Sequence, residues 1–370
     1  MATSEILPSY KALYLSANSD IAILEMGPSS PYTPQNSQSL VRVRYSGINP
    51  GDVRHFWMGM NSFVMGYDFS GTVVDSGPSS PFSPGDEVLG MTFPGHQRAM
   101  HAGAHQAFLL ADPYMTWRRP ADLEARWAAS MATAAQTAAD ALFNCLGFGL
   151  EAAGVDGNSA RGQALLIWGG SSSVGWAALH LARAAGFEAV FVTASPANHE
   201  ALRVAGAARC FDYHSPAVVH DIRRAAEDLA LPLYAVFDAV GAGLGVFEPP
   251  RAGVEDFSRS SPAVAKLCLA DGALARGEAR LCCALPVAQD ADWTFALFSR
   301  KGDMQETQHP GWWQRQDKVV SWLIDNHESA WRPLPKISVV DTAEDAVVAL
   351  GDAFDGKLSM EKVLMQHPLR

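Results

Sequence analysis

Apolar and polar positions alternate in two different rhythms along the chain. Between residues 164 and 238, short apolar runs are separated by segments whose apolar residues recur at helical spacing. The predicted strands are 164–168, 189–193, 210–212 and 234–238, and the predicted helices are 174–185, 198–205 and 217–229. Such an alternation is typical of a doubly wound parallel α/β sheet.

A glycine- and serine-rich turn separates the first of these strands from its helix. Gly170, Ser172 and Gly175 fit the spacing G-x-G-x-x-G, with Ser172 in place of the middle glycine. The free N–H groups and the positive dipole end of the following helix favour an anionic phosphate. The turn therefore predicts a dinucleotide site, although a loop that only connects a strand to a helix could carry the same residues.

The end of the second strand bears on the choice of cofactor. NAD enzymes usually place a carboxylate there to bind the ribose 2′-OH, whereas this chain has Thr193, Ala194 and Ser195. Ser195, Asn198 and Tyr213 could donate hydrogen bonds to a 2′-phosphate. NADPH is therefore favoured over NADH, with ordinary turn capping as the alternative role of Ser195 and Asn198.

The first third of the chain has a different pattern. Short alternating segments at 11–15, 21–25, 40–45, 67–75 and 86–90 predict strands between turns rich in Pro, Ser and Gly. A length of 370 residues favours two domains.

Composition and charge exclude several classes of protein. The net charge of −11 without a basic run makes nucleic acid and anionic membranes unlikely partners. The absence of a long apolar stretch and of a signal peptide predicts a cytoplasmic protein. The five cysteines, odd in number and mostly in apolar segments, are interpreted as reduced core residues.

Five motifs in order give a more specific interpretation. NPGD (49–52), GYDFSGTVV (66–74), PGDEVLG (84–90), TAAQTA (133–138) and GGSSSVG (169–175) together resemble the medium-chain dehydrogenase/reductase superfamily. SGINPGDVR (46–54), the segment 193–216, DWTFALF (292–298) and GKLSMEKVLMQ (356–366) are similar to the trans-acting enoyl reductases of fungal polyketide synthases. The resemblance implies a Rossmann domain at 131–310, inserted into a GroES-like catalytic domain formed by 1–130 and 311–370, with the active site in the cleft between them.

The resemblance also implies which residues would bind ligands. The cofactor-binding candidates are Gly51, Asp52, Val53, Arg54, Gly170, Ser171, Ser172, Ser173, Val174, Gly175, Ser195, Pro196, Ala197, Asn198, Tyr213, Ala284, Leu285, Leu358 and Ser359. The substrate-binding candidates are Asn49, Thr133, Thr137, Phe295, Ala296, Leu297 and Phe298. Thr133 and Thr137 could equally be packing residues of their helix, and 295–298 could equally be a buried edge strand.

Arg54 and Thr137 are the catalytic candidates. Arg54 occupies a position at which similar enoyl reductases carry a lysine, so a cation there could bind cofactor or stabilise negative charge on the substrate. Arginine does not act as a general acid, which weakens a role as proton donor. The alternative is a surface arginine paired with Asp52.

No metal is expected in the catalytic domain. Zinc enzymes of the superfamily use a Cys and a Gly-His-Glu motif, and here Asn49 and Gly66-Tyr67-Asp68 stand in those positions. His96, His101 and His105 are the remaining candidate ligands, and we expect them to be solvated loop residues.

Three functions remain open. The first is an NADPH-dependent enoyl reductase that delivers hydride to the β-carbon of an α,β-unsaturated thioester carried by a polyketide synthase or its acyl carrier domain. The second is a zinc-free quinone or enone reductase that acts on free small molecules. The third is a non-redox cyclase, isomerase or scaffold that binds a polyketide, suggested by Ser172, Ala197 and Met360, which depart from motifs near the expected cofactor.

Overall fold

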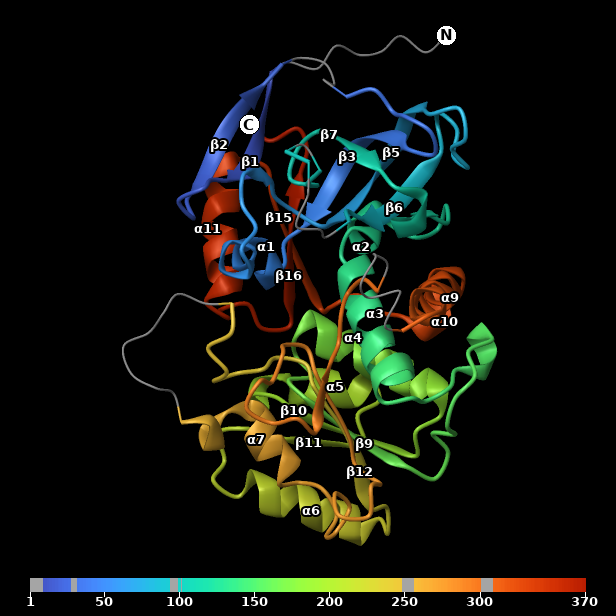
Figure 1. The fold of residues 1–370 in the computed structure, drawn as a ribbon, viewed down its shortest axis with the longest axis vertical. Coiled ribbons are helices and arrows are strands. Elements are labelled where there is room, and N and C mark those ends of the chain that lie inside the picture. The colour runs from blue at the N-terminus through green and yellow to red at the C-terminus, as the bar shows by residue number, and fades with distance from the viewer. Residues whose placement is uncertain (1–8, 28–31, 94–98, 101, 248–255, 301–308) are drawn as a thin grey trace. The chain divides into compact units, whose positions relative to one another are not determined.

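The computed structural model describes residues 9–27, 32–93, 99–100, 102–247, 256–300 and 309–370. Two compact units make up the chain (Figure 1). Unit 1 comprises Met1–Thr133 and Lys336–Arg370, and unit 2 comprises Ala134–Pro335. Unit 2 is thus inserted into a unit built from both ends of the chain.

Unit 1 is mainly β-structure. Its strands are β1 (Tyr10–Leu15), β2 (Ile21–Met26), β3 (Ser39–Gly47), β4 (Phe63–Val64), β5 (Asp68–Ser76), β6 (Glu87–Met91), β7 (Phe108–Ala111), β8 (Thr116–Arg118), β15 (Lys336–Val340) and β16 (Glu361–Gln366). Its helices are α1 (Pro50–Arg54), α2 (Ala125–Ala128) and α11 (Ala343–Phe354), while α3 (Ala132–Ala139) crosses into unit 2.

One sheet of unit 1 joins the two ends of the chain. Its strand order is β15-β16-β3-β5-β6-β8, with β7 paired to β3. C-terminal β16 runs antiparallel to β3 and pairs Leu364 with Gly47. The next strand, β5, pairs Asp68 with the same Gly47. Residues near positions 47, 68 and 364 are therefore brought together although they are far apart in the sequence.

Unit 2 contains the predicted parallel sheet. Its strands are β9 (Ala164–Trp168), β10 (Ala189–Thr193), β11 (Arg209–Phe211), β12 (Leu233–Asp238), β13 (Arg280–Cys283) and β14 (Trp293–Phe295). Its helices are α4 (Ser173–Ala185), α5 (His199–Val204), α6 (Val218–Asp228), α7 (Ser261–Lys266), α9 (Trp312–Asp325) and α10 (His327–Ala330), with a π-helical turn at Asp140–Cys145.

The order of the strands confirms the doubly wound fold. The sheet runs β11-β10-β9-β12-β13-β14, all parallel, so the order reverses beside β9. Strands of such a sheet are covered on both sides and are hydrophobic throughout, and all five residues of β9 and of β10 are buried. Ligands of open parallel sheets bind at the carboxyl ends of the strands beside such a reversal.

The second boundary between the units lies later than the sequence suggested. Residues 311–335 belong to unit 2 and not to unit 1. The reason is that α9 packs on the π-helical turn and bonds to it: Arg315 Nη2 donates to the carbonyl oxygen of Phe143 at 2.6 Å. Gln316 Nε2 donates to the carbonyl oxygen of Leu297 at 2.8 Å.

None of the five cysteines forms a disulfide, and Cys268, Cys282 and Cys283 are buried, in agreement with reduced core residues. Within the described residues, no helix has the length and apolar character needed to cross a membrane.

Candidate functional site

The glycine-rich turn of unit 2 requires three glycines for steric reasons. Gly169 has a φ of +87°, which side chains rarely tolerate. A Cβ on Gly170 would lie 2.0 Å from Cγ1 of Val192 in the neighbouring strand. A Cβ on Gly175 would lie 2.3 Å from the carbonyl oxygen of Gly169. The turn therefore holds the start of α4 directly against the ends of β9 and β10.

Ser172, which replaces the middle glycine of the motif, is the N-cap of α4. Its φ of −75° and ψ of 156° suit any residue, so the backbone does not need glycine here. Its Oγ accepts the N–H of Gly175 at 3.0 Å and donates to the carbonyl of Gly169 at 2.8 Å. The serine thus preserves the turn, and the other N–H groups of the first turn of α4 have no carbonyl within the helix.

The end of β10 brings two hydroxyl groups together. Ser195 Oγ and the phenol oxygen of Tyr213 lie 3.4 Å apart, although 18 positions separate them in sequence, and both side chains reach the surface. Thr193 turns inward, because its Oγ1 accepts the N–H of Gly169 at 3.0 Å. Pro196–Asn198 forms a short 3-10 turn after Ser195, so Ala197 also lies at this edge.

A buried carboxylate organises the end of β12. Asp238 accepts hydrogen bonds from the N–H groups of Val240 and Gly241 at 3.0 and 2.9 Å, and from Ser261 Oγ at 2.5 Å. Burial raises the pKa of Asp238, against the opposite effect of these three donors. The N–H of Ala284 binds the carbonyl of Asp238 at 2.8 Å, which places Ala284 and Leu285 beside this strand end.

The segment Phe295–Phe298 is mostly not a strand. β14 ends at Phe295, and the following residues are held by a buried ion pair that sequence reasoning missed. Arg300 contacts both oxygens of Asp140, and its Nη2 also donates to the carbonyl of Phe295 at 2.7 Å. Asp140 Oδ2 accepts the N–H of Leu297 at 2.8 Å. The expected substrate wall is therefore fixed by polar contacts on its backbone, while Ala296 is buried.

Asn49 is the hub of the candidate site in unit 1. Its backbone N–H donates to Asp52 Oδ2 at 2.7 Å. Its side-chain Nδ2 donates to Asp68 Oδ2 at 3.0 Å and to the carbonyl of Gly47 at 3.2 Å. Its Oδ1 accepts from Lys362 Nζ at 2.7 Å. Because both amide hydrogens are directed inward, Asn49 could meet a substrate only through its oxygen.

Lys362 is the most important residue of this cluster that sequence reasoning missed. Its ammonium lies 3.0 Å from Asp68 Oδ2, and the two side chains are 2% and 0% exposed. Removing one partner of a buried ion pair typically costs about 3–5 kcal/mol. Only the pairing of β16 with β3 brings residue 362 near residue 68. No local sequence pattern therefore predicts the ion pair between Lys362 and Asp68.

His105 is not a solvated loop residue, so that expectation was wrong. Its ring is fully buried, with Nε2 3.3 Å from Asp52 Oδ2 and Nδ1 2.9 Å from Ser46 Oγ. The physical reason is the glycine at position 66, whose missing side chain leaves room for the ring. His96 and His101 lie outside the described residues.

The remaining candidates of unit 1 lie in α1 and before β16. Gly51, Val53 and Arg54 are partly exposed on α1. A surface pair between Arg54 and Asp52 would require an exposed carboxylate, whereas Asp52 is fully buried. In the turn that ends at Met360, Leu358 is partly exposed and Ser359 is exposed.

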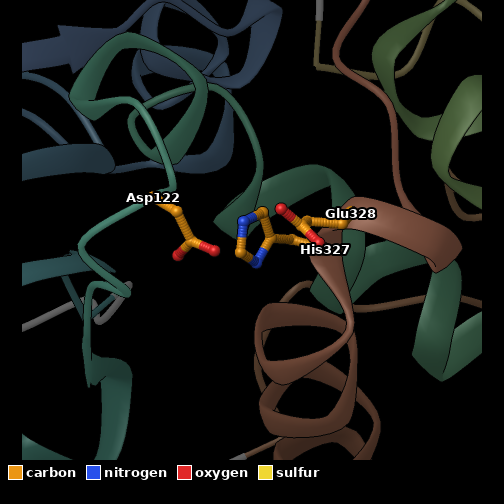
Figure 2. Close-up of side chains that lie close together, drawn as sticks. All are labelled: Asp122, His327 and Glu328. Atoms are coloured by element: carbon orange, nitrogen blue, oxygen red, sulfur yellow. The ribbon is translucent and has the colours of Figure 1, made fainter.

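The chemistry of these side chains does not suit zinc. Both oxygens of Asp68 and both polar atoms of the Asn49 amide are engaged with protein groups, and an ammonium already neutralises the carboxylate. His327 and Glu328 are neighbours in α10 of unit 2, and Figure 2 draws them with Asp122 of unit 1. Because Asp122 belongs to unit 1 and the other two residues belong to unit 2, we assign no metal site to these three residues.

Comparison with known proteins shows similarity to one domain family and to several fungal enzymes. Residues 35–139 match the alcohol dehydrogenase GroES-like domain. The trans-enoyl reductase grgB of a Penicillium species is 36% identical over 192 residues, which cover 51% of this chain and 53% of that protein. Several other fungal relatives, 30–36% identical, are named trans-enoyl reductases or dehydrogenases. The chain spans about half the length of the curated relatives it matches.

Solved structures show the same fold over the whole chain. The crystal structure of CurK enoyl reductase has a TM-score of 0.64 at 16% identity, covering 97% of this chain and 98% of that chain. The structure of mycobacterial Rv1454c complexed with NADPH has a TM-score of 0.65 at 20% identity, covering 97% and 100%.

The fold and its glycine-rich turn define a GroES-like unit with an inserted Rossmann unit. The match to the alcohol dehydrogenase GroES-like domain and the similarity to fungal trans-enoyl reductases agree with the resemblance to the medium-chain dehydrogenase/reductase superfamily.

Proposed function

We propose that this protein is an NADPH-dependent, trans-acting enoyl reductase that saturates an α,β-unsaturated thioester in polyketide biosynthesis. The observation that carries the proposal is the relationship to several trans-enoyl reductases at 30–36% identity. Its substrate would be an acyl chain attached to a polyketide synthase or its acyl carrier domain.

The described residues of unit 2 fit a dinucleotide phosphate. The first turn of α4 offers N–H donors held in place by Ser172, at the carboxyl edge of the sheet where such ligands bind. Ser195 and Tyr213 offer two hydroxyls beside the second strand, and Thr193, Ala194 and Ser195 include no carboxylate to repel a 2′-phosphate. When bound, NADPH supplies the hydride that the reduction requires.

Two further residues, Arg54 of unit 1 and Thr137 of unit 2, would serve the substrate. Reduction at the β-carbon leaves negative charge on the thioester oxygen, which a cation or hydrogen-bond donor stabilises. We assign Arg54 as that cation and Thr137 as a hydrogen-bonding partner. An arginine does not release a proton at neutral pH, so the proton for the α-carbon comes from another group or from water.

The test is a comparison of substrates with the purified protein. We expect NADPH consumption with a carrier-bound 2-enoyl thioester, product saturated at the α and β carbons, and much slower consumption with a simple quinone or free enone. Equal efficiency with quinones would favour a reductase of free small molecules. Tight binding of a polyketide without affinity for NADPH would favour a non-redox cyclase, isomerase or scaffold.

A further inference from the structure

The Lys362 side chain crosses a strand to reach its partners. β16 and β5 lie on opposite sides of β3, and Gly47 of β3 pairs with both Leu364 and Asp68. A Cβ on Gly47 would lie 2.9 Å from Cε of Lys362 and 3.1 Å from Cβ of Asp68. The missing side chain at position 47 is what allows the lysine to pass over β3 to Asp68.

The second oxygen of Asp68 anchors the start of α3. Asp68 Oδ1 accepts both the backbone N–H and the hydroxyl of Thr133, each at 2.7 Å. Thr133 is the second residue of α3, and a carboxylate at this end of a helix satisfies an N–H group that has no carbonyl within the helix. A continuous chain of polar contacts therefore runs from Lys362 through Asp68 to Thr133.

We propose that Lys362 is a positioning residue for the reaction, which acts through Asp68 to fix Thr133 and the first turn of α3. This inference rests on the proposed function, in which Thr137, one turn after Thr133 on α3, contacts the substrate. Lys362 balances the charge of a carboxylate that is fully buried, and Asn49 holds the ammonium from a second side. A lysine at this point thus sets the position of the helix that carries Thr137.

The same contacts restrict what Thr133 can do. While its hydroxyl hydrogen is donated to Asp68, it is not available to the thioester oxygen of a substrate. Thr133 is therefore not the donor that stabilises the negative charge formed during reduction. That task stays with Arg54, Thr137 or water.

The experiment compares kcat/KM for a 2-enoyl thioester in the wild type, Lys362→Met, Thr133→Val and the double variant. We expect each single variant to lose at least tenfold and the double variant to lose no more than about threefold beyond the worse single one, because both substitutions break one chain of contacts. Thr133→Ser, which keeps the hydroxyl, should stay within threefold of the wild type. Independent losses that multiply in the double variant would overturn the proposal.

A lysine from the neighbouring strand provides the matched control. Lys336 of β15 pairs with Glu361 at 2.8 Å, and its side chain is 66% exposed, so Lys336→Met should leave kcat/KM within twofold. Binding of a saturated, non-reducible thioester, measured by calorimetry, should weaken in Lys362→Met and not in Lys336→Met. Equal binding in the two variants would contradict the proposal.

A further variant covers the case in which Lys362→Met does not fold. The double variant Lys362→Met and Asp68→Asn leaves no unpaired buried charge, so it should fold while still losing at least tenfold in kcat/KM. Wild-type values in this variant would overturn the role of Lys362. A wild type that shows no reduction of any enoyl thioester would instead overturn the proposed function.

Discussion

Ser46 Oγ lies 2.8 Å from Nε2 of His367, joining the third strand to the end of the chain. Both side chains are buried, and Ser46 also contacts Nδ1 of His105 at 2.9 Å. Burial, together with a smaller electrostatic effect of His105, lowers the pKa of His367 to about 3. His367 is therefore neutral in the folded protein at every pH at which the protein is expected to work.

The neutral His367 predicts a loss of stability in mild acid. The unfolded chain binds a proton at this residue below a pH of about 6.5, whereas the folded protein does so only near the lowered pKa. The contribution of His367 to the free energy of unfolding is therefore complete above pH 6.5. It falls by about 1.4 kcal/mol per pH unit as the pH drops toward 3. We expect urea unfolding between pH 6.5 and 4.5 to show a shallower pH dependence in His367→Gln than in the wild type. Identical slopes of the free energy of unfolding against pH in the two proteins would contradict the lowered pKa of His367.

The hydroxyl pair of Ser195 and Tyr213 predicts selectivity for the cofactor. In Ser195→Ala and in Tyr213→Phe, the affinity for NADPH should fall by about 1.5–3 kcal/mol, the usual contribution of a hydrogen bond to a charged group. The affinity for NADH, which lacks the 2′-phosphate, should hardly change. Fluorescence titration with both cofactors measures the difference. Equal losses for the two cofactors would mean that the hydroxyls support only the fold.

The backbone conformation of Met360 should have a measurable effect on the free energy of unfolding. Its φ is +53°, a conformation that favours glycine. Its side chain is nevertheless 6% exposed, so replacing it removes buried apolar surface. We expect Met360→Ala to be destabilised by about 2 kcal/mol or more, and Met360→Gly to be about 1 kcal/mol more stable than Met360→Ala. Denaturant unfolding of the three proteins decides the order.

Gly66 predicts a strong steric effect next to His105. Its φ is +96°, and a Cβ would lie 2.5 Å from Nδ1 of the buried His105 ring. Gly66→Ala should lower the free energy of unfolding by about 2 kcal/mol or more, since both the backbone and the ring would have to move. Gly27→Ala is the matched control, because a Cβ there meets no atom within 4 Å, and it should stay within about 0.5 kcal/mol.

From the residues around Asp68, we expect NADPH binding and turnover to be independent of zinc. A neutral amide at position 49 and an ion pair at position 68 offer no set of three ligands for a catalytic zinc ion. Prolonged dialysis against a strong chelator should leave NADPH binding and turnover unchanged, with well under one zinc per chain by elemental analysis. Stoichiometric zinc whose removal abolishes turnover would reverse this prediction.

The sequence alone determined the features that depend on local pattern. Strands β9 and β10 fall at the predicted residues, because buried parallel strands are apolar throughout and are bounded by glycine turns. The start of α4 at the glycine turn was predictable for the same reason. Thr193–Ser195 could be assigned to the edge of the sheet from its place after the second strand.

The tertiary structure decided which distant residues share a buried environment. Lys362 looks like a surface lysine in sequence, and only the pairing of β16 with β3 beside Gly47 carries it to Asp68. The exposure of His105 was mispredicted, because the room for its ring comes from Gly66, 39 positions earlier. Sheet pairing joins residues without regard to their separation along the chain, so buried ion pairs such as Lys362 with Asp68 and Arg300 with Asp140 leave no local signal in the sequence.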